Sequence, residues 1–389
     1  MIAFENTEIA FRSKSDNDLK RSYFLFKTLS HNNLVKLGGS LTQSAIKMHI
    51  PVNWVVKPTI YKQFVGGETI EECRPTVRNL QEYNVKAILD YSVEGKESDE
   101  DIKAAFIETL RTIKNAGKNS NIPFAVFKST AFTTPDILEN VSVGKKLTDN
   151  EKQEAERFKT RIETLCKAAY ESNISILIDA EDSWFQNFID DVVNEMMAKY
   201  NKKKAIIFNT FQMYRHDRLG FLEESFQKAF DGNYFLGAKF VRGAYMEKER
   251  ERAQQMGYPS PIQADKESTD RDFNAALKFC VEHIDRISIF NGTHNEYSAG
   301  YLTGLMEQNG LEKNDPRIWF SQLYGMSDHI SFNLAYAGYN VAKYLPYGPV
   351  KHVIPYLVRR AEENTSVKGQ TGRELSLISK EIGRRKSAN

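Results

Sequence analysis

Two adjacent arginines near the C-terminal end are the residues best suited to bind a small anion. Four side chains recur there at i, i+3, i+4 and i+7: Tyr356, Arg359, Arg360 and Glu363. That spacing puts them on one face of a helix. Planar guanidinium groups hold carboxylates through paired hydrogen bonds, but a solvated surface helix would show the same charges. The segment 341–366 therefore predicts either a carboxylate-binding helix or an exposed charged one.

A second set of polar side chains stands where short apolar runs end. Lys128 lies at the end of FAVFKS, Asp179 ends ISILID, and Tyr344 lies in VAKYL. Further members of the set are Asn209, Gln212, Lys239, Arg242, Tyr245, His294, Asn295, Gln322 and Leu323. Each alone has an ordinary explanation, such as a surface lysine or a helix cap. Unrelated surface residues have no reason to recur at the same end of successive runs, so we interpret the set as one rim.

Three chemistries suit such a rim. Lys128 could form a Schiff base with a carbonyl substrate. Asp179, Glu181 and His294 could bind a divalent metal ion. The cationic and aromatic groups could instead hold a large anionic cofactor and a small carboxylate. This third chemistry uses more of the residues, and the small-residue turn at 242–244 (Arg-Gly-Ala) would let backbone N–H groups approach phosphates closely.

The elements that must position these residues are eight short apolar runs. They cover residues 85–91, 124–129, 174–179, 205–209, 235–241, 287–291, 317–322 and 341–345. Helical periodicity separates them, as at 99–116, 152–170, 184–200 and 219–230. Strands that alternate with helices predict right-handed βαβ units and a parallel sheet. Eight units predict a (β/α)8 barrel, whose chemistry sits at the carboxyl ends of its strands.

A doubly wound open sheet is the alternative fold. It would need a glycine-rich phosphate turn after its first strand, and the sequence contains neither GxGxxG nor GxxxxGK[ST]. We therefore expect an α/β protein with a distorted, TIM-like (β/α)8 barrel. Its parts would be an N-terminal helical arm at 1–80, the barrel at 81–366 and a C-terminal tail at 367–389.

Composition restricts the class of partner and the compartment. The net charge of +2 gives no reason to expect nucleic acid as a partner. Three well-separated cysteines form no metal-binding spacing and indicate a reducing compartment. The first twenty residues lack the apolar core of a signal peptide and contain four acidic residues. We expect a cytoplasmic protein whose basic tail makes at most a peripheral contact with the inner membrane face.

The motifs KFVRGAYMEKERERA, GTHN, FSQLYGM, KYLPYGPV and YLVRRAEEN together resemble the flavin-dependent proline dehydrogenases, in the monofunctional, eukaryotic-like branch. The resemblance covers roughly residues 85–366. It implies a distorted barrel that binds FAD and oxidises L-proline to Δ1-pyrroline-5-carboxylate, with hydride passing from proline C5 to flavin N5. It also implies a quinone as electron acceptor and a pyrroline-5-carboxylate dehydrogenase as a downstream partner.

The resemblance also implies how the substrate is held. Arg359 and Arg360 would bind the carboxylate with help from Lys128, which Asp179 would orient. Tyr245, Leu323 and Tyr344 would pack around the ring, and Tyr356 and Glu363 would position the arginine-bearing helix. Glu94 would pair with the first of the two arginines and so act as a gate to the site. The phenol of Tyr344 would leave little room for a 4-hydroxyl group, so we expect proline to be preferred over hydroxyproline.

For the cofactor, the resemblance implies contacts from Ala180, Gln212, Arg242, Gly243, Ala244, Thr293 and His294, with Lys266 and Thr269 near the adenosine. Lys239 stands where many bacterial relatives have an arginine near flavin N5. An ammonium is a point charge on a flexible stem, unlike a planar guanidinium. The resemblance implies Asp179 and Lys239 as the catalytic residues. We expect no metal ion.

Overall fold

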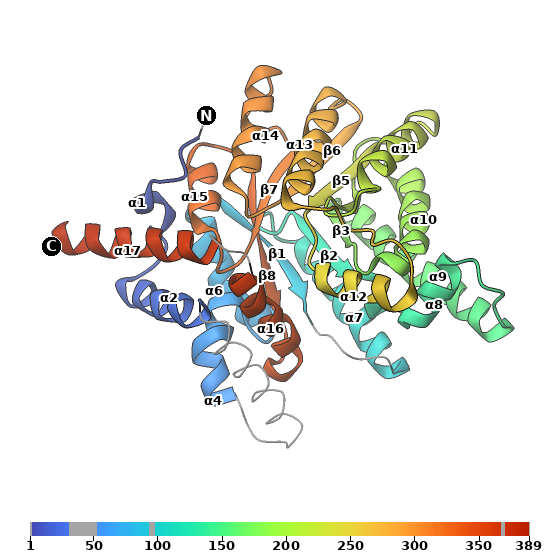
Figure 1. Ribbon diagram of the computed structural model, residues 1–389, viewed down its shortest axis with the longest axis horizontal. Coiled ribbons are helices and arrows are strands. Elements are labelled where there is room, and N and C mark those ends of the chain that lie inside the picture. The colour runs from blue at the N-terminus through green and yellow to red at the C-terminus, as the bar shows by residue number, and fades with distance from the viewer. Residues whose placement is uncertain (1, 31–52, 93–97, 367–369, 389) are drawn as a thin grey trace. The chain divides into compact units, whose positions relative to one another are not determined.

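The computed structural model describes residues 2–30, 53–92, 98–366 and 370–388. Eight strands follow one another around a closed barrel in chain order (Figure 1). They are β1 (Val85–Tyr91), β2 (Phe124–Lys128), β3 (Ser175–Asp179), β4 (Ile207–Gln212), β5 (Leu236–Val241), β6 (Ile287–Gly292), β7 (Ile318–Leu323) and β8 (Val341–Tyr347). The predicted (β/α)8 barrel is confirmed, and each predicted run contains one strand or part of one.

Helices occupy the connections. Before β1 lie α1 (Thr7–Ala10), α2 (Asp16–Leu29), α4 (Asn53–Val56), η1 (Lys57–Tyr61), α5 (Lys62–Phe64) and α6 (Ile70–Gln81). Between the strands lie α7 (Asp99–Ala116), η2 (Ser129–Ala131), α8 (Pro135–Ser142), α9 (Asp149–Glu171), α10 (Ser183–Tyr200), α11 (Arg218–Asp231), α12 (Met246–Met256), α13 (Lys266–Glu282), α14 (Glu296–Gln308) and α15 (Asp328–Tyr336). After β8 come α16 (Val350–Ser366) and α17 (Gln370–Ala388).

Hydrogen bonds of the Asn201 side chain explain why strand β4 differs from the predicted run 205–209. The side-chain oxygen of Asn201 accepts the N–H groups of Ile206 and Ile207 at 2.9 and 2.8 Å, and its amide donates to the carbonyls of Ile207 and Phe235 at 2.9 Å. One buried side chain therefore holds the entry to the strand. The strand begins at Ile207 and runs on to Gln212, which becomes its last residue.

Close contacts divide the chain into two compact units. We call Lys96–Ser321 the central unit, and Ile2–Gly95 together with Gln322–Asn389 the terminal unit. In the central unit, parallel pairing places Lys128 beside Asp179 and Thr210 beside Lys239. Phe124, at the start of β2, packs its ring edge-to-face on Phe290 and Trp319, with centroids 5.0 and 5.2 Å apart. Aromatic side chains thus pack at the amino end of β2, and the polar Lys128 lies at its carboxyl end.

In the terminal unit, β1 pairs in parallel with β8 from Val85 and Val341 to Tyr91 and Tyr347. Helix α17 packs on α2, and α1 packs on α15 (Figure 1). Ser15 begins α2 with a capping box, in which its hydroxyl accepts from the Asp18 N–H and the Asp18 carboxylate accepts from the Ser15 N–H. In α17, Leu377 and Ile378 are buried in this unit's apolar core. The C-terminal segment is thus helical and contributes to that core.

Candidate active site

Asp179 stands between two lysines in the central unit. Its Oδ1 lies 2.5 Å from Nζ of Lys239, and its Oδ2 lies 3.6 Å from Nζ of Lys128. The three side chains come from the carboxyl half of β5 and the last residues of β3 and β2. The Lys239 side chain is only 5% exposed, against 23% for Lys128. Two ammonium groups therefore lie on one carboxylate, and cationic groups at this edge suit the binding of an anion.

Arg242, just after β5, is held in place from three directions. Its guanidinium donates to Asp270 at 2.8 Å, to the Thr293 hydroxyl at 2.7 Å and to the Ser298 hydroxyl at 3.0 Å. Its Cζ lies 4.5 Å from the centre of the Phe273 ring. Burial lowers the pKa of Arg242, and the Asp270 carboxylate opposes that change. A guanidinium fixed this firmly is a preorganised site for an anionic group.

Asp270 also joins the predicted adenosine residues to this cluster. Lys266, in the first turn of α13, forms an ion pair with Asp270 on the same carboxylate that Arg242 contacts. Thr269 is buried, and its hydroxyl donates to the Asp265 carbonyl at 3.2 Å. The structure therefore brings Lys266 next to the Arg242 cluster, while the Thr269 hydroxyl bonds to the cap of its own helix.

The turn after Arg242 requires glycine. Gly243 has φ +131°, and a Cβ at that position would lie 2.5 Å from the ring carbons of Tyr214. The backbone N–H of Tyr214 donates to the Arg242 carbonyl at 2.8 Å, which holds the ring under the turn. Ala244 is exposed and Tyr245 half-buried. The backbone at 243–244 is therefore accessible to a ligand that approaches closely.

The buried polar atoms without a hydrogen-bond partner among the described residues include Oε1 of Gln212 and the hydroxyl of Tyr214, both at this rim. The amide nitrogen of Gln212 is used, because it donates to the Glu181 carbonyl at 3.0 Å and to the Ala180 carbonyl at 3.4 Å. Buried polar atoms without partners are costly and commonly meet a ligand or water. Both atoms lie beside residues predicted to contact the flavin, so the site fits such a group.

The loop after β6 supplies the remaining predicted cofactor residues. The Thr293 hydroxyl accepts from Arg242 and from the Asn295 N–H, the latter at 3.1 Å. Asn295 in turn begins α14 by accepting the Ser298 N–H at 3.0 Å. His294 lies between them and is half-buried. Thr293 is therefore placed as a partner that orients Arg242.

Asn209 behaves differently from the rest of the predicted rim. It is fully buried, and its amide donates to Asp190 of α10 at 2.9 Å. Asp190 also accepts from Arg218 of α11 at 2.8 Å. Because side chains alternate along a strand, Asn209 faces the helix layer while Thr210 faces the other side. Its inclusion in the rim was wrong.

In the terminal unit, Tyr344 lies in the middle of β8, because the strand continues beyond the predicted 341–345 stretch to Tyr347. Tyr344 is 7% exposed, and its carbonyl accepts the Tyr324 N–H at 2.7 Å. Leu323, the last residue of β7, is half-buried. The neighbouring Lys343 is completely buried and forms an ion pair with Asp328 at 2.8 Å.

The arginine-bearing helix α16 is largely buried at Tyr356, the first of the four residues predicted to share one helix face. Tyr356 and Leu357 pack into the apolar cluster of the terminal unit, where Phe26 also lies. Arg360 is 7% exposed, and its Cζ lies 5.3 Å from the centre of the Tyr356 ring. Arg359 is half-buried. This helix face is therefore not an exposed one, because Tyr356 and Arg360 are both buried.

Two predicted residues cannot be placed in full. Glu94 lies outside the described residues, and Glu363 belongs to α16 but its side chain is not described. Across the described ranges, no three His, Cys, Asp or Glu side chains come close enough together to hold a metal ion. Sequence reasoning missed Asp270, Ser298 and Tyr214. Their only signal is polarity or aromaticity near a strand end, which many surface residues share.

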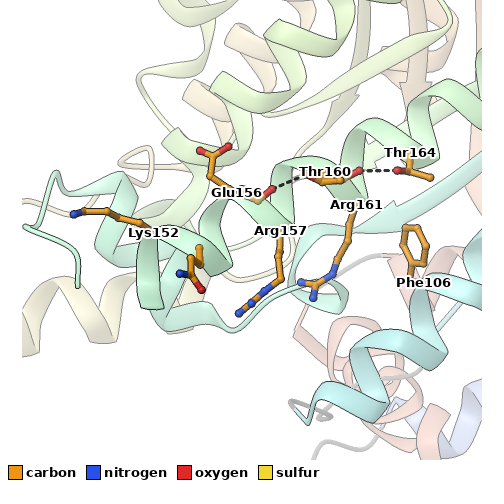
Figure 2. Close-up of a pocket in the computed structure, with 8 residues that line it drawn as sticks. Phe106, Lys152, Glu156, Arg157, Thr160, Arg161 and Thr164 are labelled. Carbon is orange, nitrogen blue, oxygen red and sulfur yellow. Dashed lines mark hydrogen bonds between the residues drawn. The ribbon is translucent and has the colours of Figure 1, made fainter. Parts of the chain in front are cut away.

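A groove on the outside of the central unit is separate from this rim (Figure 2). It runs along α9, with one residue from α7, and is lined by Phe106, Lys152, Gln153, Glu156, Arg157, Thr160, Arg161 and Thr164. The Thr160 and Thr164 hydroxyls donate to carbonyls one turn earlier, at 2.9 and 2.7 Å. None of the lining residues ends a strand.

Comparison with known proteins identifies the family. Residues 73–373 match the family described as proline dehydrogenase. The chain is 35% identical over 322 residues to the carbapenem antibiotics biosynthesis protein CarD of Pectobacterium carotovorum subsp. carotovorum, covering 83% of each chain. It is 31% identical over 426 residues to proline dehydrogenase 1, mitochondrial, of Dictyostelium discoideum, covering 98% of this chain and 74% of that protein.

Two further similarities bear on specificity and fold. A hydroxyproline dehydrogenase of Xenopus laevis is 29% identical over 412 residues, covering 96% of this chain and 88% of that protein. The solved structure of proline utilization A from Bdellovibrio bacteriovorus superimposes with a TM-score of 0.72 at 20% identity. The match covers 92% of this chain but 38% of that longer one, and it supports the fold alone.

The predicted cytoplasmic location is wrong. The Dictyostelium relative and those of Homo sapiens and Arabidopsis thaliana are named as mitochondrial proteins. Their names overturn the expectation, which rested on local composition alone. As a separate finding, no helix in the described part of the chain has both the length and the apolar character needed to cross a membrane. The family match over most of the sequence and the barrel with its cationic rim lead to one conclusion: this chain belongs to the proline dehydrogenase family of oxidoreductases.

Proposed function

We propose that this chain oxidises L-proline to Δ1-pyrroline-5-carboxylate with FAD as its cofactor. The observation that carries the proposal is the rim of the central unit, where Asp179 pairs with Lys239 and Lys128 next to the fixed Arg242 and the Gly243 turn. FAD, when bound, supplies the hydride acceptor for proline C5. The protein's part is mainly to bind and orient the reactants.

The cofactor would be held by the residues around the β5 and β6 ends. Arg242 offers a charged group to the pyrophosphate, and the Gly243–Ala244 backbone offers close approach. The remaining contacts would come from Ala180, Gln212, Thr293 and His294, with Lys266 and Thr269 toward the adenosine. The unpartnered Oε1 of Gln212 supports this assignment, because a ligand with N–H donors would satisfy it.

The substrate carboxylate would be bound by Arg359 and Arg360, with Lys128 as a third cation. Arg360 already rests against Tyr356, which limits the freedom of its guanidinium. Glu363 would support the same helix, and Glu94 would act as the gate. Tyr245, Leu323 and Tyr344 would form the wall around the ring. A reacting carbon has to be held within about 3.5 Å of its acceptor, which requires both ends of the substrate to be fixed.

The cationic residues have a second role in the proposed mechanism. Proline must be bound with a neutral ring nitrogen, because a cation resists the loss of hydride. Nearby positive charges lower the pKa of an amine. Lys128, Lys239 and the two arginines would therefore favour the reactive form of the substrate. Asp179 would hold both lysines in position and limit their mutual repulsion.

The proposal has three further parts. Electrons would pass to a quinone, and a pyrroline-5-carboxylate dehydrogenase would take the product. Proline would be preferred over trans-4-hydroxyproline. The last assignment rests on the bulk of the buried Tyr344. The Xenopus relative is named a hydroxyproline dehydrogenase, so the preference within the family is not uniform.

A visible spectrum tests the proposal directly. The purified protein should show flavin absorbance that bleaches when proline is added without oxygen. A flavin that stays oxidised with proline would contradict the dehydrogenase assignment. A colourless protein in which borohydride traps a carbonyl substrate on Lys128 would favour a Schiff-base lyase instead.

A further inference from the structure

Glu181 is a buried carboxylate that the proposed mechanism does not use. It lies two residues beyond the end of β3 and is 7% exposed. Its Oε1 accepts the backbone N–H of Thr130 at 3.0 Å, and its Oε2 accepts the Thr130 hydroxyl at 2.6 Å. One carboxylate thus takes both donors of a single residue in the short helix η2, which directly follows β2. This bond pair ties the loop after β2 to the loop after β3.

The backbone of Glu181 is fixed as firmly as its side chain. Its N–H donates to Oε1 of Gln186 at 3.0 Å, and its carbonyl accepts from Gln212 at 3.0 Å. Gln186 is itself held by Asp190 at 2.9 Å. Because α10 and β4 anchor Glu181, the carboxylate is a rigid support and Thr130 is the part that it restrains.

The restrained loop carries Lys128. Lys128 is the last residue of β2 and lies two residues before Thr130. It is the more exposed of the two lysines that contact Asp179, and its 3.6 Å separation from that carboxylate is looser than a direct hydrogen bond. A fixed η2 therefore limits where the end of β2 can carry the Lys128 ammonium.

We propose that Glu181 is a positioning residue that acts through Thr130 to hold Lys128 where it binds the substrate carboxylate. The inference rests on the proposed function, since it needs Lys128 to contact the substrate. In this proposal Glu181 acts through Thr130 and not by direct contact with the substrate or the cofactor. Its contribution is to keep the β2 and β3 ends in one fixed relation.

The Thr130 donors and Lys128 favour the ionised form of Glu181 against the effect of its burial. Burial raises the pKa of Glu181 to about 7, while the Thr130 donors and Lys128 act in the opposite direction. The charged groups that act on it are Lys128 from β2 and Asp182 from its own loop; Gln186 of α10 and Gln212 of β4 are neutral. A buried acid carries a desolvation cost, and the two Thr130 donors are the interactions that offset it here.

The test is a double-mutant cycle between Glu181→Gln and Lys128→Met in the flavin-loaded enzyme. Glutamine keeps the shape but offers Thr130 only one acceptor atom. We expect Glu181→Gln to raise the proline KM by about tenfold, the size of a lost charge-assisted hydrogen bond, with kcat changed much less. In the Lys128→Met background the same substitution should raise KM no further, because its effect passes through Lys128.

Glu249 provides the matched control. It is a completely buried carboxylate of α12 that also accepts the backbone N–H and the hydroxyl of one residue, Ser183, at 2.6 and 2.5 Å. Its burial likewise raises its pKa. Whatever Glu249→Gln does to stability or to KM, that effect should be the same in the wild-type and in the Lys128→Met background, because its bonds go to the first residue of α10 and not to η2.

The outcomes separate the inference from the function beneath it. An equal rise of KM from Glu181→Gln in both backgrounds would overturn the inference, because the effect would then be general. If Lys128→Met raises KM and Glu181→Gln does not, the inference alone fails. If Lys128→Met leaves KM unchanged, the assignment of Lys128 to the substrate fails as well. Should Glu181→Gln not fold, Thr130→Val should raise KM and Thr130→Ser should not; equal KM values for these two variants would count against the inference.

Discussion

Lys239 on β5 forms an ion pair with Asp179 on β3, although β4 lies between the two strands. The residue of β4 in register with Lys239 is Thr210, whose hydroxyl donates to the Ile178 carbonyl at 2.7 Å. A short side chain at that position leaves room for the ammonium to reach across. The Asp179 carboxylate thereby fixes the Lys239 ammonium, which stands at the end of a flexible side chain.

We predict that Asp179→Asn destabilises the protein and lowers kcat/KM for proline by at least about 100-fold. Removing one partner of a buried ion pair typically costs about 3–5 kcal/mol. Thermal unfolding and steady-state kinetics measure the two effects. Asp149→Asn is the control, because Asp149 pairs with Lys152 on the surface, where such pairs contribute little. Equal melting temperatures for the two variants would contradict the buried-pair interpretation.

We predict that Arg359→Met or Arg360→Met raises the proline KM strongly while flavin stays bound. Each substitution removes a charge-assisted contact, with a typical cost of about 2–5 kcal/mol when the other partner is left unpaired. Flavin absorbance in the purified variants and initial rates at varied proline measure this. Arg384→Met on α17 is the control, since Arg384 pairs with Glu381 of its own helix. An unchanged KM in both variants would rule out binding of the substrate carboxylate by Arg359 and Arg360.

We predict that the wild-type enzyme has a higher kcat/KM for proline than for trans-4-hydroxyproline, and that Tyr344→Ala narrows the ratio. The phenol is buried, so its removal opens space where a hydroxyl group would lie. Parallel kinetics with both substrates provide the ratio. Comparable values in the wild type would show that Tyr344 does not select between them.

We predict that Gly243→Ala abolishes flavin binding. Its Cβ would meet the Tyr214 ring at 2.5 Å, in addition to the strain of a φ of +131°. Gly257→Ala is the matched control, because Gly257 has φ +73° and a Cβ there would meet nothing within 4 Å. The control therefore carries backbone strain of about 1 kcal/mol without a collision. Flavin content and melting temperature should fall much further for Gly243→Ala than for the control.

We predict a pH-dependent stability difference between wild type and Glu181→Gln. The folded-state pKa of Glu181 is raised to about 7 from 4.5, so its favourable contribution is present below pH 4.5 and is lost as pH rises through 7. The glutamine variant does not titrate, and its stability relative to wild type should grow by up to about 3 kcal/mol between pH 5 and 8. Melting temperatures across this range measure it; a constant difference would contradict the raised pKa.

Local pattern was sufficient for the barrel strands and for several rim residues. The β-branched runs and the alternation of strands with helices are short-range properties of the chain, so the eight strands and helices such as Asp99–Ala116 could be predicted. Lys128 and Asp179 could be predicted as neighbours, because parallel strands present their carboxyl ends together. The family motifs are equally local, since each lies within a single strand end, turn or helix.

Only the tertiary structure decided which partners these residues have. Asp270 lies 28 residues from Arg242, and Thr130 lies 51 from Glu181, and no local signal links such distant positions. Whether Tyr356 is buried depends on what packs against α16. Whether the Asn209 side chain points toward the helices or away from them depends on where β4 begins. The sequence by itself determined the elements and the residue types at their ends, because backbone geometry is local. Packing determined the pairs, because burial forces each polar group to find a partner wherever the fold brings one.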